Sequence, residues 1–287
     1  MKGATIMSTL THDTKPKTRT VFHSNPVLSR LSKITERSET NTATYRGIAV
    51  KTTYFLLITL VGMIAQLLVK ASMANEPIWQ TIQVYEKFTV SLAKKEALIV
   101  GAVLVAGFIC ELIGIFARKT VPVTGTLYSA SQGYVISFLV FKVLTGYEYL
   151  GLQALLLTVA VIAVMTYLYS SGIIKADKKF RTVLLSLVLG SIGLGVLTFL
   201  GLLIPATRPY VEAVMQNAGF SIALDVIGLI IASLFLISDF SMIDDCVRDH
   251  YPKEYEWSAA FGLVFTVIWI YLKILDLLMQ FAGKDDQ

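Results

Sequence analysis

Seven long apolar runs dominate this sequence of 287 residues. They cover about 50–70, 97–117, 123–143, 149–171, 182–204, 218–240 and 258–281, with short polar breaks between them. Each run approaches the roughly 20 residues that an α-helix needs to cross about 30 Å of hydrocarbon. Backbone amides in lipid must be satisfied within the segment, and the alternation typical of barrel strands is absent. The sequence therefore predicts an all-α integral membrane protein, a bundle of seven transmembrane helices.

The composition also favours the bilayer over water as the main solvent. Charged residues make up 16% of the chain, against roughly 25% in soluble domains, and the mean hydropathy is +0.66. Cys110 and Cys246 are too few for a disulfide framework or a cysteine-based metal site. The sequence has no His-Glu-x-x-His motif, P-loop or Rossmann glycine motif, and no histidine falls inside an apolar run. We expect neither an enzyme nor a bound cofactor.

The first 46 residues differ from the rest of the chain. They are polar, basic and rich in Ser and Thr, without a periodic apolar pattern, which predicts a mostly disordered tail. They also lack the continuous apolar segment of a signal peptide. We therefore divide the chain into a tail, 1–46, and a membrane domain, 47–287.

The distribution of Lys and Arg predicts the orientation. Seventeen lie on the side of the N-terminus: nine up to Lys51, two after the second run, four after the fourth and two after the sixth. Seven lie on the opposite side, and Lys273 falls inside the last run. This imbalance predicts a cytoplasmic N-terminus and an opposite C-terminus, and it makes the net charge of +5 a topological signal, with no nucleic-acid partner expected. A re-entrant last segment, which would place both termini on one side, is the alternative.

Polar side chains at membrane depth are the candidate functional residues, because they are costly in hydrocarbon unless paired or hydrated. Four of them reach similar depths from the cytoplasmic side and predict an ion pathway: Glu111, Gln132, Asp239 and Thr266. Each has a structural alternative as well. Glu111 pairs with Arg118 or stays protonated, and Gln132 joins helices by hydrogen bonds. Asp239 instead lies at the aqueous interface, followed by a cytoplasmic acidic loop that contains Asp244, Asp245 and Asp249.

A second polar group is predicted nearer the far side. Asp225 precedes Asp239 by fourteen residues, so the two carboxylates share a helix face about 21 Å apart. Lys273 and Asp276, at i and i+3, neutralise one another or meet Asp225 across the bundle. This group continues the ion pathway toward the far side, or it is a structural ion pair.

Several segments resemble the bacterial Bax inhibitor-1/YccA-like branch of the Bax inhibitor-1 family. The resemblance covers about residues 24–281 and rests on the order and spacing of these segments: Ser24–Arg30 (SNPVLSR), Gly151–Met165, Ser171–Arg181 (SGIIKADKKFR), Asp239–Asp244 (DFSMID) and Glu256–Leu275 (EWSAAFGLVFTVIWIYLKIL). It implies a seven-helix bundle with the last helix central, in a bacterial cytoplasmic (inner) membrane. It also implies a pH-sensitive calcium leak, gated by aspartates on the sixth and seventh helices that share a proton.

The match to this gate is incomplete. Asp239 takes the place of the sixth-helix aspartate, whereas the seventh-helix partner falls on Thr266, which cannot supply a second charge. Gln132 stands where many relatives carry a glutamate. Ca²⁺ favours several oxygen ligands, more than one of them a carboxylate, so Asp239 predicts at most a weak Ca²⁺ site.

The sequence and the resemblance together predict a passive, pH-influenced cation leak with Ca²⁺ as the transported ion. The alternative is a non-conducting regulator or adaptor that binds a membrane protease or another membrane protein, as some relatives do. In that case, the basic tail is the segment that the partner holds.

Overall fold

The computed structural model describes residues 42–83, 88–215 and 217–282. Most of the predicted tail, 1–46, lies outside these ranges. Within them the chain is mainly helical, with one antiparallel hairpin, which confirms the helical class. The elements in chain order are α1 (Tyr45–Ser72), β1 (Ile78–Gln83), β2 (Thr89–Ala93), α2 (Lys94–Phe116), the 3₁₀-helix η2 (Arg118–Thr120), α3 (Val121–Phe138), the π-helix η3 (Leu139–Val143), α4 (Tyr149–Ser170), α5 (Lys178–Leu203), α6 (Arg208–Met215), α7 (Ala218–Arg248) and α8 (Tyr255–Ala282).

Six helices of the described ranges are long and apolar enough to cross a membrane: α1, α2, α4, α5, α7 and α8. The predicted third run, 123–143, forms α3 and η3, which are not among these six. Thr124, Tyr128, Ser129 and Ser137 occupy buried positions of α3. These polar side chains lower the hydropathy of α3, while packing buries one side of the helix and leaves Val123 and Leu127 exposed.

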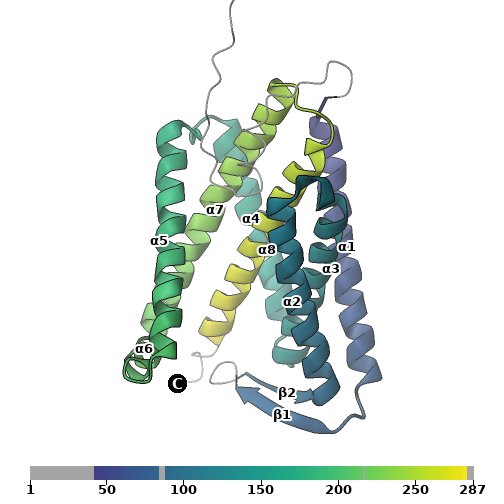
Figure 1. The fold of residues 1–287 in the computed structure, drawn as a ribbon, viewed down its shortest axis with the longest axis vertical. Helices are drawn as coiled ribbons and strands as arrows, with labels where there is room; N and C mark the ends of the chain where they lie inside the picture. Colours follow the sequence, from purple (N-terminus) through teal and green to yellow (C-terminus); the bar gives the residue numbers. More distant parts are fainter. Residues whose placement is uncertain (1–41, 84–87, 216, 283–287) are drawn as a thin grey trace, which may run out of the picture.

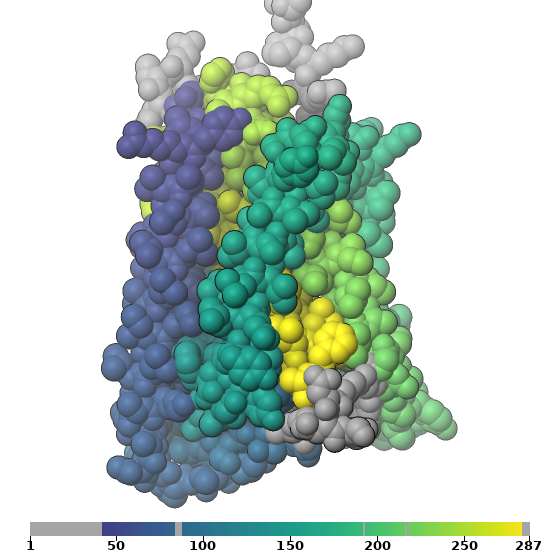
Figure 2. Space-filling view, turned by 180° about the vertical axis from the view of Figure 1, so that it is seen from behind, coloured from purple at the N-terminus to yellow at the C-terminus, as the bar shows by residue number. Residues whose placement is uncertain are grey.

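The helices form a bundle with a dense side and a sparse side (Figure 1). On the dense side, α1 packs against α3 and α2 packs against α3, whereas on the sparse side α5 contacts α6 and α7. The last helix, α8, packs against α1, α3, α4 and α7. Its most apolar window is 56% buried, compared with 6% for that of α5. Toward its C-terminus, α8 is visible at the surface between α4 and α7 (Figure 2).

Glycine allows the backbones of α1 and α3 to come very close. A Cβ atom on Gly133 would lie 1.8 Å from the carbonyl oxygen of Thr59, and one on Gly62 would lie 2.0 Å from that of Ala130. Any larger residue at either position would force the helices apart, as at other close helix contacts in membranes. This contact fixes α3 at the wall of the bundle that faces α8.

The structure corrects the predicted boundaries at two places. The sixth run was expected to end near residue 240, but α7 continues to Arg248, because Met242 and Cys246 are fully buried on its inner face. The break between the first two runs contains the β1–β2 hairpin, which the sequence analysis missed. Strand β1 is exposed throughout, whereas β2 buries Val90 and Leu92, so only one strand carries a clear apolar pattern.

Candidate functional site

A carboxylate and a hydroxyl meet in the interior of the bundle. Asp239 of α7 is 0% exposed and Thr266 of α8 is 1% exposed. The Thr266 hydroxyl donates a hydrogen bond to Asp239 Oδ2 at 2.5 Å, and it lies 3.2 Å from the carbonyl oxygen of Gly262, one turn earlier. The structure therefore brings together the two residues that the sequence placed at the gate position.

The helix ends place this pair well inside the bundle. Asp239 lies nine residues before Arg248 and Thr266 lies eleven after Tyr255, which correspond to about 13 Å and 16 Å along the helix axes. Leu236 and Met242, three residues to either side of Asp239 on α7, are fully buried. An ionised carboxylate is costly in such apolar surroundings unless it is hydrogen-bonded, which gives the Thr266 hydroxyl its importance.

Glu111 and Gln132 lie at a different helix interface. Glu111 of α2 is partly buried and close enough to Tyr128 of α3 to interact electrostatically. The Gln132 amide of α3 faces Gly107, one turn before Glu111. Within the described ranges no ion pair joins Glu111 to Arg118, so that predicted pairing is wrong. The four predicted pathway residues are divided between the α2–α3 and α7–α8 interfaces.

Aromatic rings link these two interfaces. The Tyr128 ring lies 5.3 Å from that of Phe261 and 6.0 Å from that of Phe265, both on α8, measured between centroids. Phe261 is fully buried. Since Thr266 directly follows Phe265, this cluster is the packed connection between the region of Glu111 and the α7–α8 contact.

The second polar group forms around Asp225. Lys273 Nζ donates to Asp225 Oδ1 at 2.7 Å, and the amide of Gln280 donates to Oδ2. Lys273 therefore reaches across to α7, which was one of the two predicted arrangements, and Asp276 lies on the same helix at a half-buried position. Gln280, two turns beyond Lys273, was not expected to take part, because an amide carries no charge to mark it.

The structure corrects the prediction of a cytoplasmic acidic loop. Asp244 and Asp245 belong to α7, and Asp249 follows its last residue at an exposed position. Asp244 accepts hydrogen bonds from the hydroxyls of Tyr45 of α1 and Tyr169 of α4. Asp245 pairs with Arg181 of α5 at 3.1 Å. Successive residues of a helix point in different directions, so the two carboxylates are held by different helices packed against the end of α7. They do not form an open mouth that attracts cations.

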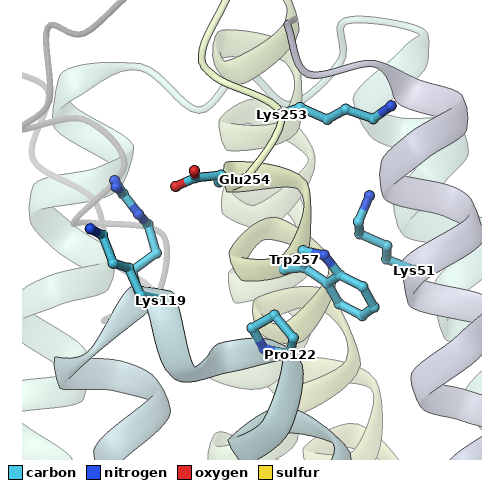
Figure 3. Close-up of a pocket in the computed structure, with 7 residues that line it drawn as sticks. Lys51, Lys119, Pro122, Lys253, Glu254 and Trp257 are labelled. Carbon is cyan, nitrogen blue, oxygen red and sulfur yellow. The ribbon is translucent and has the colours of Figure 1, made fainter.

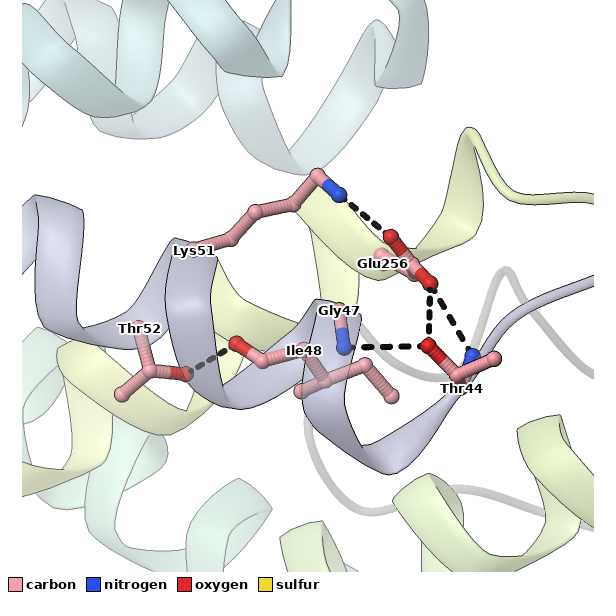
Figure 4. Close-up of polar contacts among 6 residues, drawn as sticks. All are labelled: Thr44, Gly47, Ile48, Lys51, Thr52 and Glu256. Carbon is pink, nitrogen blue, oxygen red and sulfur yellow. Dashed lines mark hydrogen bonds and ion pairs between the residues drawn. The ribbon is translucent and has the colours of Figure 1, made fainter.

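The sequence analysis also missed the role of Glu256, which is 0% exposed (Figure 4). One oxygen of its carboxylate accepts from the amide and hydroxyl of Thr44, at 3.0 and 3.1 Å, and the other oxygen pairs with Lys51. The Thr44 hydroxyl in turn caps α1 by accepting from the amide of Gly47. This network ties the start of α1 to the start of α8. The sequence indicated this network in one way only, by a threonine, Thr44, just before a long apolar run, which is typical of a helix N-cap.

The described residues contain no group of three or more His, Cys, Asp or Glu side chains that could hold a metal ion. A Ca²⁺ ion bound in a protein site is coordinated by roughly six to eight oxygen ligands. The side chains of Asp239 and Thr266 supply three oxygens.

Comparison with known protein families agrees with this architecture. The family model described as "Bax inhibitor 1 like" matches residues 25–283, which includes every helix of the bundle. No match is found among curated proteins. The apolar helices and the family match together identify an integral membrane protein in contact with the lipid bilayer. The chain belongs to the Bax inhibitor 1-like family.

Proposed function

We propose that this protein is a passive cation leak of a bacterial cytoplasmic membrane, with Ca²⁺ as the transported ion and the Asp239–Thr266 contact as its closed gate. The observation that carries the proposal is a fully buried carboxylate whose partner on α8 is a hydroxyl. The Thr266 hydroxyl carries no charge of its own, so this contact by itself does not neutralise the carboxylate, and in our proposal a cation takes the place of the hydroxyl.

The geometry also suggests how the gate opens. Separating α7 from α8 by the length of one hydrogen bond frees Asp239 Oδ2, and a cation then replaces the hydroxyl as its partner. A hydrogen bond of this kind contributes about 1.5–3 kcal/mol when the acceptor is charged. The proton-sharing aspartate pair implied by the resemblance is missing here, because Thr266 does not titrate. The proposed pH influence acts through Asp239 alone.

The proposal includes a seven-span topology. α3 and η3 run without a break from Val121 to Val143, and 23 residues of helix extend about 34 Å, enough to cross the hydrocarbon. With α3 as the third span, α8 is the central helix. The N-terminus then lies in the cytoplasm, as the distribution of Lys and Arg predicts. No catalytic residue or cofactor takes part.

The test is Ca²⁺ flux into liposomes that contain the purified full-length protein. We expect flux above that of empty vesicles, and a loss of most of it in Asp239→Asn. Asp249→Asn is the matched control, because it removes the same charge from an exposed position just after the same helix. Absence of flux between about pH 6 and 8, or equal flux in both variants, would refute the leak.

One observation favours the adaptor alternative. α5 packs against the bundle along only part of its length, and three of its glycines, Gly190, Gly193 and Gly195, have no neighbouring atom within 4 Å of an added Cβ. Small residues on a lipid-facing helix allow a second transmembrane helix to approach closely. The partner would be a membrane protease or another membrane protein.

Deletion of residues 1–41 and replacement of Gly193 by Leu distinguish the two functions. If the protein is an adaptor, one of these changes abolishes co-purification of a membrane partner, and the wild type conducts no Ca²⁺. If it is a leak, flux persists in Gly193→Leu, because this residue lies far from the Asp239–Thr266 contact in the sequence and on another helix.

A further inference from the structure

A basic cavity opens at the end of the bundle where α1 and α8 begin and α3 follows η2. It has a volume of about 500 Å³ and is lined by Lys51, Arg118, Lys119, Pro122, Lys253, Glu254 and Trp257. In Figure 3, Lys119 lies on one side of Glu254 and Trp257, and Lys51 and Lys253 lie on the other. Three separate parts of the chain therefore direct positive side chains toward one space.

The cavity keeps an excess of positive charge after its ion pairs are considered. Lys51 is paired with Glu256, which lies outside the lining. Arg118, Lys119 and Lys253 remain, against the single carboxylate of Glu254. None of these three cations forms an ion pair with another residue of the described ranges. An anionic ligand would be attracted to the cavity.

Arg118 supplies a second, independent observation. Its guanidinium lies over the ring of Tyr255, 3.8 Å from the centroid, which fixes the plane of the group. The Nε and Nη1 atoms are buried and have no hydrogen-bond partner among the described residues. Buried donors without an acceptor are costly. Nε–H and Nη1–H lie on different edges of the guanidinium plane, so each leaves a charged donor for a separate anionic oxygen.

At the start of α3, the amide of Val121 bonds to the carbonyl oxygen of Arg118 and Pro122 has no N–H, so side chains would hold the anion. Trp257 adds an aromatic wall of the kind found at membrane–water interfaces.

We propose that this cavity binds a phosphoryl anion, held by the positive charges of Arg118, Lys119 and Lys253. Two sources share this chemistry: the phosphate of an anionic lipid headgroup and free inorganic phosphate. The cavity lies at the ends of membrane-spanning helices, where lipid headgroups lie. This site is separate from the Asp239–Thr266 contact and does not depend on the leak.

The test uses the full chain in a neutral detergent and native mass spectrometry to count retained phosphatidylglycerol. Lys119→Ala with Lys253→Ala should reduce retention about fivefold for each lysine removed, as expected for basic residues beside anionic lipid. Lys178→Ala with Lys179→Ala is the matched control, since it removes the same charge from exposed positions at the start of α5. Arg118→Lys should also reduce retention, because it keeps the charge but removes the planar group that lies over Tyr255, and Glu254→Gln should increase it.

Adding inorganic phosphate distinguishes the two sources. Retained lipid that phosphate does not displace assigns the site to a headgroup, whereas phosphate binding without lipid retention assigns it to the free ion. Both outcomes support the proposal if the cavity variants lose binding and the control pair does not. The proposal is overturned if neither ligand binds the wild type, or if the cavity pair and the control pair lose binding equally while their unfolding midpoints match.

Discussion

Two carboxylates of α7 face α8, and α8 donates different groups to each of them. Asp225 receives the ammonium of Lys273 at 2.7 Å and the amide of Gln280, so both of its oxygens are bonded by α8. Asp239, fourteen residues later, receives the neutral hydroxyl of Thr266. The first contact cancels a charge and joins the helices, whereas the second holds a charge without cancelling it. The α7–α8 pair therefore contains a structural ion pair at Asp225 and, in our proposal, a gate at Asp239.

Burial sharpens this contrast. Asp225 is 7% exposed, and the side chain of its partner Lys273 is 31% exposed. Asp239 and Thr266 are 0% and 1% exposed. The lysine of the first pair can reach water or lipid headgroups, while Asp239 and Thr266 are enclosed. An enclosed carboxylate is costly, which is the arrangement expected of a functional position.

The largest effect is expected from breaking the charged contact. Lys273→Met leaves Asp225 without a counter-charge, and loss of one partner of a buried ion pair costs about 3 kcal/mol. We expect the midpoint of unfolding in a denaturing-detergent titration to fall accordingly. The double variant Asp225→Asn with Lys273→Met is the control and should recover most of that loss. A single variant as stable as the wild type would show that the contact contributes nothing to the joining of α7 and α8.

The next largest effect, on the pH dependence of Ca²⁺ flux, is expected when the Asp239–Thr266 contact is changed into a pair of carboxylates. Thr266→Asp places a second carboxylate beside Asp239. At low pH the two share a proton and hold the helices together, and at high pH both are charged and repel. Ca²⁺ flux should therefore increase with pH, with a ratio between pH 8 and pH 6 about tenfold larger than in the wild type, a difference of about 1.4 kcal/mol. Thr266→Ser, which keeps the hydroxyl, should retain the wild-type pH profile, and an unchanged profile in Thr266→Asp would remove Asp239 from the gate.

Helical spacing in the sequence places Asp225 and Asp239 on one face of α7, and in the structure both contact α8. This spacing did not predict that Gln280 and Glu256 of α8 would also form contacts. It could not distinguish the partners of Lys273, because Asp276 on its own helix and Asp225 across the bundle were equally reachable. In the structure Lys273 lies 2.7 Å from Asp225, because the packing of α7 against α8 brings the two side chains together. Sequence spacing carries no information about this packing.

The residues that sequence reasoning misplaced depend on neighbouring helices. Asp244 and Asp245 look like a solvated loop because they follow a polar break in the apolar pattern. They remain helical because Tyr45, Tyr169 and Arg181 from three other helices bind them. Glu111 and Gln132 share a depth with Asp239 but face a different interface, and depth carries no information about the direction of a side chain around the bundle.

The smallest effect is expected from a variant that removes one of the two donors to Asp225 and keeps the other. Gln280→Leu removes the amide that donates to Asp225 Oδ2 while Lys273 keeps the charge paired. Loss of a hydrogen bond to a charged acceptor that keeps its main partner should lower the free energy of unfolding by about 1 kcal/mol. Gln132→Leu is the matched control, because the described residues give its amide no hydrogen-bond partner, and it should change stability little. Equal losses in both variants would mean that the amide of Gln280 acts only through packing, and that charge alone distinguishes the Asp225 contact from the Asp239 contact.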